Sequence, residues 1–316
     1  MNLRPLGRSG IAIAPLILGG NVFGWNTDQQ TSSAILDAFV DEGFNAVDTA
    51  DSYSRWAPGH VGGESEMVIG RWLKNSGKRD RVVIATKVGS DMGEGKSVRK
   101  DYILRAADAS LRRLGVETID LYQTHFDDEV TPVEETLAAY ARLIADGKVR
   151  AIGASNISPA RLSASLAASR SGGLPRYDSL QPLYNLADRK GFETNYAALC
   201  RAEGIGVIPY YGLAAGFLTG KYRSAADAEK NPARGGRVKD YLDARGLGIL
   251  EALDGVAARH VATPAQVALA WLMAQPAVTA PIASATSLAQ LNDIMKAPRL
   301  KLSPEDLAAL DTASRR

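Results

Sequence analysis

The feature that most constrains this chain of 316 residues is a repeated alternation of short apolar runs with longer helical segments. The runs are β-rich, and the longer segments carry apolar residues at helical spacing. Several of these segments begin with Ser, Thr or Asp and stop at Gly, which are residues that cap helices. Such alternation predicts a parallel sheet with helical crossovers. Eight runs are the expected strands: Pro15–Gly19, Phe44–Asp48, Val82–Lys87, Ile119–His125, Val149–Ser155, Ser179–Gln181, Ile205–Tyr210 and Thr279–Ile282.

Eight strand–helix units in one chain favour a closed (β/α)8 TIM barrel, which we expect to be a single domain over residues 1–316. An open doubly wound sheet would usually carry a G-x-G-x-x-G turn after its first strand, and LILGGNVFGW lacks that turn. The stretch LRPLGRSGIAIAPL is predicted to form an N-terminal β-hairpin that closes the barrel floor. We expect two extra helices in Tyr241–Gln275 and a last one at Pro304–Ser314.

Composition excludes several classes of protein. The chain is 46% hydrophobic and 23% charged, which is ordinary for a globular protein with a real core. The net charge of +2 comes with no basic block, so we expect no nucleic-acid partner. The single cysteine, Cys200, allows no intrachain disulfide and fits a reducing cytoplasm. His60, His125 and His260 are scattered, so no metal site is expected. No signal peptide and no membrane-spanning apolar run are recognised.

Four polar residues lie at or just beyond the ends of predicted strands, where barrel enzymes place their chemistry. Asp48 closes FNAVD, Tyr53 follows in DTADSYS, Lys87 closes VVIATK and His125 closes IDLYQTH. Taken singly, each is more often a cap, a solvated charge or a satisfied polar residue. Four of them in one predicted ring indicate a catalytic site.

These four side chains suit carbonyl reduction. Carbonyl reduction needs a proton donor for the oxygen, and a tyrosine with a pKa of about 10 is a poor acid at neutral pH. The ammonium of Lys87 would favour the phenolate and make Tyr53 a better acid. Asp48 can pair with Lys87 and hold it in place. His125 can donate a hydrogen bond to the carbonyl oxygen.

The sequence resembles the aldo-keto reductase family along nearly its whole length. The resemblance rests on DTADSYS, GGESEMVIGRWLK, VVIATKVG, SLRRLGVETIDLYQTHFDD, ADGKVRAIGASNIS, QPLYNL, GFLTGKYR and TPAQVALAWLM. It implies a catalytic tetrad of Asp48, Tyr53, Lys87 and His125 in an NADP(H)-dependent reductase of aldehydes and ketones. The chain also resembles the β-subunits of voltage-gated potassium channels, in which the histidine position is changed. The presence of His125 favours a working enzyme.

The same resemblance implies a cofactor groove. Ser155, Asn156 and Gln181 look like the residues that bind the nicotinamide carboxamide, and Tyr210 looks like the aromatic residue on which the ring stacks. Gly20 and Asn21 are expected to approach the cofactor through their backbone. Further contacts implied by the resemblance come from Asp48, Tyr211, Gly212, Leu213, Ala215 and Ser284.

Two departures from the family pattern affect this groove. Tyr211 and Gly212 replace a frequent Ser-Pro pair, and Thr286 and Ile294 stand where many relatives have arginine and asparagine. We expect NADP(H) to be preferred over NAD(H) nonetheless, because a helix start near Thr286 can bind an anion. In the comparison with channel subunits, Gln290 and Asp293 match residues that face the adenosine. Lys221 and Arg237 match residues that supply positive charge.

The aromatic residues Phe23, Trp25, Trp56, Phe126 and Tyr211 flank these motifs and are expected to line the pocket mouth. Such walls suit apolar or planar carbonyls, or sugars stacked on tryptophan. Two other functions are compatible with the pattern: a regulatory subunit that senses nicotinamide redox state, and a lyase or isomerase that uses Lys87 as a Schiff base. The sequence carries no signal for the substrate, the reaction direction or the oligomeric state.

Overall fold

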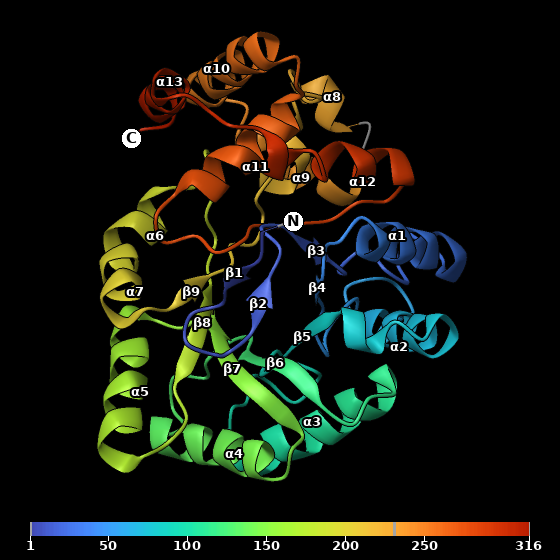
Figure 1. The fold of residues 1–316 in the computed structure, drawn as a ribbon, viewed down its shortest axis with the longest axis vertical. Helices are drawn as coiled ribbons and strands as arrows, with labels where there is room; N and C mark the ends of the chain where they lie inside the picture. The colour runs from blue at the N-terminus through green and yellow to red at the C-terminus, as the bar shows by residue number, and fades with distance from the viewer. Residues whose placement is uncertain (1, 230–231, 316) are drawn as a thin grey trace.

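In the computed structural model, short parallel strands form a barrel and helices form a ring around it (Figure 1). The structure describes residues 2–229 and 232–315. Each strand pairs with its neighbour in the order β10-β3-β4-β5-β6-β7-β8-β9. The strands are β3 (Ile17–Gly19), β4 (Ala46–Asp48), β5 (Val83–Val88), β6 (Ile119–Thr124), β7 (Val149–Ser155), β8 (Tyr177–Gln181), β9 (Gly206–Val207) and β10 (Ile282–Ala283). The predicted (β/α)8 fold is confirmed.

The first and last strands of this order meet and complete the circle. The backbone N–H of Thr279 donates to the carbonyl of Val207 over 2.8 Å, and that of Ile282 donates to Pro209 over 2.9 Å. Both strands are shorter than the sequence predicts. The physical reason is that Pro209 and Pro281 have no N–H to contribute to a strand ladder.

The helices of the ring follow the predicted segments and their capping residues. The side chain of Asp28 accepts from the N–H of Thr31 at the start of α1, and Gly115 ends α3 in the left-handed conformation. The ring helices are α1 (Gln29–Asp41), α2 (Glu64–Ser76), α3 (Lys100–Leu114), α4 (Val133–Ala145), α5 (Pro159–Gly172), α6 (Lys190–Asn195), α7 (Ala197–Glu203), α11 (Pro264–Ala274) and α12 (Leu288–Ile294). Short 3-10 turns lie at η1 (Arg79–Arg81) and η3 (Ala297–Arg299).

The C-terminal part differs in one respect from the sequence-based expectation. Of the two helices expected in Tyr241–Gln275, only α10 (Ala244–His260) is an addition; α11 fills the ring between β9 and β10, with most of its side chains buried. The other addition is α13 (Pro304–Ser314), which packs against α10 outside the ring (Figure 1). The segment after β9 carries η2 (Ala214–Thr219), α8 (Ala225–Glu229) and α9 (Pro232–Lys239). None of the described helices has the length and apolar character needed to cross a membrane.

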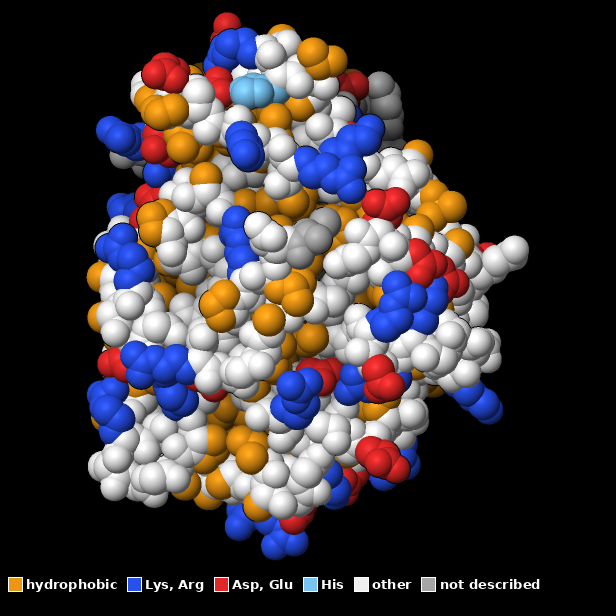
Figure 2. All heavy atoms as spheres, in the orientation of Figure 1, with side chains coloured by type: hydrophobic (Ala, Val, Ile, Leu, Met, Phe, Trp, Pro, Cys, Tyr) orange, Lys and Arg blue, Asp and Glu red, His pale blue; other side chains and the backbone are white. Residues whose placement is uncertain are grey.

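The predicted hairpin covers the barrel floor, as Figure 1 shows. Its strands, β1 (Arg4–Pro5) and β2 (Ala12–Ile13), pair antiparallel. Leu6, Ile11 and Ile13 of this hairpin pack with apolar side chains inside the barrel. On this face, basic and acidic side chains are interspersed, and no continuous basic stripe crosses it (Figure 2). The floor is therefore closed, and access to the barrel interior is from the opposite end.

Alternation along the strands explains why polar groups gather at that opposite end. Successive side chains point to opposite faces of a strand, so every second residue faces the barrel interior. In β4, Ala46 belongs to the apolar interior cluster and is followed two residues later by Asp48. In β6, Leu121 belongs to the same cluster and is followed by Gln123. The interior thus changes from apolar to polar toward the carboxyl ends of the strands.

Candidate functional site

A cleft of about 1380 Å³ opens at the carboxyl ends of the strands. This volume exceeds the roughly 300–1,000 Å³ of typical small-molecule sites, so two ligands can lie end to end in it. Asp48, Tyr53 and His125 line the cleft, and Lys87 lies directly beneath with no exposed surface. The four residues predicted from strand ends are therefore together in space.

Lys87 is the centre of this cluster. Its Nζ donates to Asp48 Oδ2 over 2.6 Å, to the carbonyl of Thr49 over 2.8 Å and to Tyr53 Oη over 3.0 Å. An ammonium has three hydrogens, so its donor capacity is fully used. These bonds fix Lys87 and hold its charge against the phenol oxygen.

Burial and charge determine the protonation states of the cluster. Burial raises the pKa of Tyr53 above its ordinary value, and the charge of Lys87 offsets only part of this rise. Burial would lower the pKa of Lys87, but the neighbouring Asp48 and Tyr53 outweigh burial and raise it. Burial and the Lys87 charge hold the pKa of His125 well below its ordinary value. At neutral pH the cluster therefore holds a protonated phenol, a charged ammonium and a neutral imidazole.

The effect of Lys87 on Tyr53 differs in part from the sequence-based expectation. Lys87 does favour the phenolate, as predicted from their charges, but the net pKa of Tyr53 is raised. Burial costs the phenolate its hydration, and this loss exceeds the attraction of the ammonium. Their places at the ends of predicted strands identify Lys87 and Tyr53 as charge partners but do not give the degree of burial.

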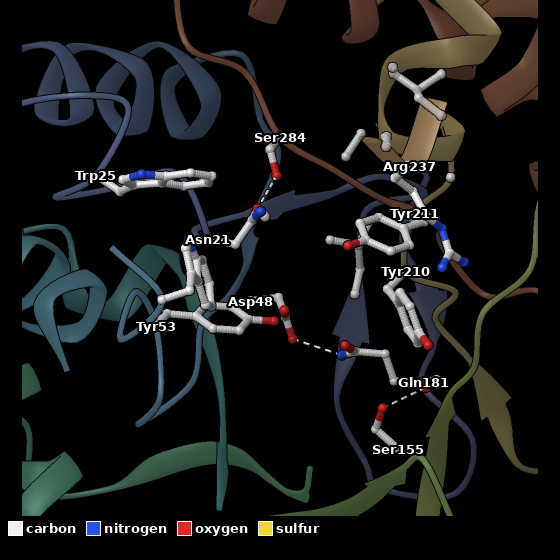
Figure 3. Close-up of a pocket in the computed structure, with 18 of the residues that line it drawn as sticks. Asn21, Trp25, Asp48, Tyr53, Ser155, Gln181, Tyr210, Tyr211, Arg237 and Ser284 are labelled. Atoms are coloured by element: carbon white, nitrogen blue, oxygen red, sulfur yellow. Dashed lines mark hydrogen bonds between the residues drawn. The ribbon is translucent and has the colours of Figure 1, made fainter. Parts of the chain in front are cut away.

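The second oxygen of Asp48 is bound from the other side of the barrel. Gln181 Nε2 donates to Asp48 Oδ1 over 2.8 Å, as the dashed line in Figure 3 shows. Gln123 Nε2 approaches the same oxygen at 3.3 Å. Gln123 was not among the predicted site residues. Its signal in the sequence is its spacing, since it lies two residues before His125 on the inward face of β6.

The residues predicted to bind a nicotinamide lie next to the tetrad. Ser155 Oγ donates to the carbonyl of Gln181 over 2.8 Å, and Asn156 Nδ2 donates to the carbonyl of His125 over 2.9 Å. The hydroxyl of Tyr210 contacts Asn156 Oδ1 at 3.3 Å. Figure 3 shows Ser155, Gln181 and Tyr210 along one side of the cleft, facing Tyr53 across it.

The cleft continues from this wall past the η2 segment toward α12. Ser284 Oγ donates to Asn21 Oδ1 over 2.6 Å on one side. Arg237 lies with its guanidinium carbon 6.0 Å from the ring centre of Tyr211 on the other (Figure 3). The predicted cofactor residues that line this part are Asn21, Tyr211, Gly212, Leu213, Ala215, Lys221, Arg237, Ser284, Gln290 and Asp293. Lys221 and Arg237 thus bring two cations to the cleft, and the neighbouring Tyr241 and Asp188 raise the pKa of Arg237.

Besides the buried Lys87, three predicted site residues do not line the cleft. Phe23 is fully buried in the core between strands and helices, so its assignment to the pocket mouth is wrong. The N–H of Gly20 donates to Asp48 O, and its carbonyl accepts from Ser65 Oγ, so neither group is free for a ligand. Thr286 directs its N–H and its hydroxyl to Gln290 Oε1. An anion site at Thr286 would therefore compete with an existing contact.

Aromatic rings form an arc around the tetrad. The ring centres of Trp25 and Trp56 are 5.5 Å apart, and those of Trp56 and Tyr53 are also 5.5 Å apart. His125 lies 5.8 Å from Tyr53, and Phe126 lies 4.7 Å from His125. Three of the predicted mouth residues thus contact the tetrad rings directly or through one another.

Several lining residues were not predicted, because they come from separate loops without a shared motif. Arg55, His60, Ser90 and Asp91 form a polar rim outside the aromatic arc. Arg55 Nη1 donates to the carbonyl of Asp91 over 2.9 Å, which joins two of these loops. No group of acidic, histidine or cysteine side chains in residues 2–229 and 232–315 could hold a metal ion.

Known proteins match this chain over nearly its whole length. The model of the Aldo/keto reductase family matches residues 15–315. The uncharacterized oxidoreductase YrpG of Bacillus subtilis (strain 168) is 33% identical over 314 residues, which cover 97% of this chain and 94% of YrpG. The L-glyceraldehyde 3-phosphate reductase of Escherichia coli (strain K12) is 33% identical over 326 residues, which cover 98% and 92%. Protein tas of Escherichia coli (strain K12) is 30% identical over 336 residues, which cover 98% and 97%.

Proposed function

This chain belongs to the aldo/keto reductase family, and we propose that it is an NADP(H)-dependent oxidoreductase with Tyr53 as proton donor. In reduction, a hydride is added to the carbonyl carbon of an aldehyde or ketone. In the reverse reaction, it is removed from the corresponding carbon of the alcohol. The observation that carries the proposal is the hydrogen-bonded chain Asp48–Lys87–Tyr53. In it, the Lys87 ammonium lies 3.0 Å from the phenol oxygen of Tyr53, a residue that lines the cleft.

The proton chemistry follows from the protonation states of the cluster. The nicotinamide, when bound, supplies the hydride. Tyr53 gives its proton to the carbonyl oxygen, and the ammonium of Lys87 stabilises the phenolate that forms. Asp48 keeps Lys87 in place through the 2.6 Å contact. In alcohol oxidation, the same phenolate accepts the proton from the substrate hydroxyl.

The neutral His125 can donate a hydrogen bond to the carbonyl oxygen of the substrate. Ser52 Oγ lies 3.4 Å from His125 Nδ1, and with Nδ1 as acceptor the ring hydrogen is on Nε2. A neutral imidazole with that hydrogen can donate to the carbonyl oxygen without competing with Tyr53 for the proton transfer. The low pKa of His125 keeps it in this state across the neutral range.

The residues present fit an NADP(H) cofactor. Ser155, Asn156 and Gln181 would hold the carboxamide beside the tetrad, and Tyr210 would stack on the ring. The adenosine end would lie near Gln290 and Asp293, which line the far end of the cleft. The cations Lys221 and Arg237, which line the same cleft, would bind the extra charge of the 2′-phosphate. This placement relies on side-chain cations and not on Thr286, whose donors are already bonded.

The aromatic arc favours planar carbonyl substrates. Trp56 is 50% exposed and Phe126 lines the cleft, so both present ring surface to a substrate at Tyr53. One relative is named for the reduction of L-glyceraldehyde 3-phosphate; in this chain the surface nearest Tyr53 consists of ring faces, and the cations Arg55 and Lys96 lie at its rim. We expect aryl aldehydes and aryl ketones to be better substrates than small aliphatic ones.

The Schiff-base alternative conflicts with the position of Lys87. A Schiff-base lysine must reach the substrate as a free amine, whereas Lys87 is fully buried and uses all three hydrogens in the protein. The regulatory-subunit alternative is separated from the enzyme by one assay. Loss of NADPH absorbance is measured with aldehydes, ketones and sugars, and its gain from NADP+ is measured with secondary alcohols. Tight NADPH binding without turnover on the whole panel would overturn the enzymatic proposal.

A further inference from the structure

Below the cleft, three buried polar side chains bond to one another in a closed ring. Gln181 Nε2 lies 2.8 Å from Asp48 Oδ1 and 3.2 Å from Gln123 Oε1, and Gln123 Nε2 lies 3.3 Å from Asp48 Oδ1. All three side chains are almost completely buried, with Gln123 at 0% exposure. Of the two glutamines, Gln181 lines the cleft and Gln123 does not.

The chemistry of a carboxylate fixes the orientation of both amides. An ionised carboxylate only accepts hydrogen bonds, so each glutamine must turn its NH2 group toward Asp48. The second hydrogen of Gln181 Nε2 then goes to Gln123 Oε1. Both hydrogens of Gln181 are committed inside the protein, and its oxygen Oε1 is the polar atom left for a ligand. Figure 3 shows the nitrogen of Gln181 turned toward Asp48.

The neighbouring strand leaves room for Gln123. In the sheet register, Gln123 lies beside Gly153, which lies beside Ser179. A Cβ at position 153 would lie 3.2 Å from the Gln123 Cγ and would collide with the Ser179 hydroxyl. Gly153 thus lets a glutamine side chain extend across the barrel toward Asp48.

We propose that Gln123 is a positioning residue that locks the amide of Gln181, so that the cofactor site offers an acceptor and selects a ring bearing an amide NH2. The proposal rests on the nicotinamide-binding function argued above. It assigns to Gln123 a role in cofactor selection that it exerts through Gln181, without touching the cofactor. Without Gln123, Asp48 still binds one hydrogen of Gln181, but the second hydrogen loses its partner, so the amide can rotate and present that hydrogen to the cleft beside Oε1.

The test compares two dinucleotides that differ at the group Gln181 would contact. NADP+ carries a carboxamide, and its 3-acetylpyridine analogue keeps the carbonyl but replaces NH2 by a methyl group. Dissociation constants are measured by isothermal titration calorimetry, which needs no turnover. We expect the wild-type protein to prefer NADP+ by roughly fivefold to tenfold, the value of one hydrogen bond.

Three variants separate positioning from a merely structural role. Gln123→Met keeps the length but removes both polar atoms. The ratio of its dissociation constants for the analogue and for NADP+ should fall toward unity. Gln123→Glu keeps an oxygen that accepts from Gln181; its carboxyl, protonated beside Asp48, can still donate to that residue, and the preference should stay near the wild-type value. Ser179→Ala is the matched control, because this buried hydroxyl in the same layer has no hydrogen-bond partner among the described residues; its preference should not change.

The outcomes distinguish this proposal from the function on which it rests. Equal affinity of the wild-type protein for the two dinucleotides, or an unchanged preference in Gln123→Met, would overturn the role of Gln123 alone. Failure of the wild-type protein to bind NADP+ at all would overturn the proposed function, and this inference with it. Loss of the preference in Gln123→Met but not in Gln123→Glu would support it.

Discussion

Replacing Lys87 by methionine removes the charge at the centre of the site while keeping much of the side-chain length. The substitution breaks three contacts, to Asp48 Oδ2, to the Thr49 carbonyl and to Tyr53. The side chains of Lys87 and Asp48 are 0% and 4% exposed, so water cannot replace the ammonium. The variant therefore contains a buried carboxylate with one oxygen unpaired.

The cost follows from this geometry. Removing one partner of a buried ion pair destabilises a protein by about 3–5 kcal/mol. Asp48 Oδ1 keeps its contacts with Gln181 and Gln123, so we place the loss near the lower bound, at about 3 kcal/mol. Carbonyl reduction should be lost as well, because no positive charge remains to stabilise the Tyr53 phenolate.

Urea unfolding measures this loss, and the chain offers a matched control. Lys148 pairs with Asp108 over 2.7 Å, but both side chains are more than a third exposed. Lys148→Met removes the same charge at the surface and should cost no more than about 1 kcal/mol. The double variant Lys87→Met/Asp48→Asn should recover part of the stability but none of the activity. A cost for Lys87→Met no greater than that of Lys148→Met would refute the reasoning.

Other predictions address the cofactor, the substrate and the outer helices. Arg237→Ala and Lys221→Ala should each lower the ratio of kcat/KM with NADPH to that with NADH by up to about tenfold, the effect of one charge-assisted contact; a preference that survives both would leave these residues without a role in it. Trp56→Ala should raise KM for an aryl aldehyde by roughly fivefold and leave a small aliphatic aldehyde unaffected; equal effects on both would remove the arc from substrate selection. Burial opposes ionisation of Asp306. Hydrogen bonds from His260 and Arg259, at the end of α10, outweigh burial and hold the pKa of this carboxyl well below its ordinary value. Its contribution to stability is therefore present above pH about 4 and lost as pH falls through the lowered pKa, which acid unfolding of wild type and Asp306→Asn would measure; the same acid sensitivity in both would contradict it.

The regular parts of the molecule were predictable because they follow local rules. Alternating strands and helices predicted the barrel, and polar residues at or just beyond strand ends predicted the tetrad. The proline-shortened strands show where this reasoning becomes imprecise. Pro209 and Pro281 are visible in the sequence, yet the loss of their ladder bonds matters only because the two strands meet.

Other features depend on three-dimensional packing and could not be predicted. Phe23 lies in a motif-rich loop, but its ring turns into the core, and no periodicity exists there to show its direction. The raised pKa of Tyr53 depends on burial by several loops. Considered alone, a glutamine such as Gln123 in a buried strand does not predict a role in the site. Its importance appears only when Asp48 and Gln181, from two other strands, are placed around it.

The proton donor is the centre of the account, and Tyr53→Phe tests it most directly. This variant keeps the ring and its contacts with the aromatic arc but removes the hydroxyl 3.0 Å from Lys87. The measurement is kcat for NADPH oxidation with the best carbonyl substrate of the panel, together with the dissociation constant for NADPH. The account predicts a fall in kcat of at least ~100-fold, the low end for loss of a general acid, with NADPH binding unchanged. Turnover close to that of the wild-type protein would contradict it.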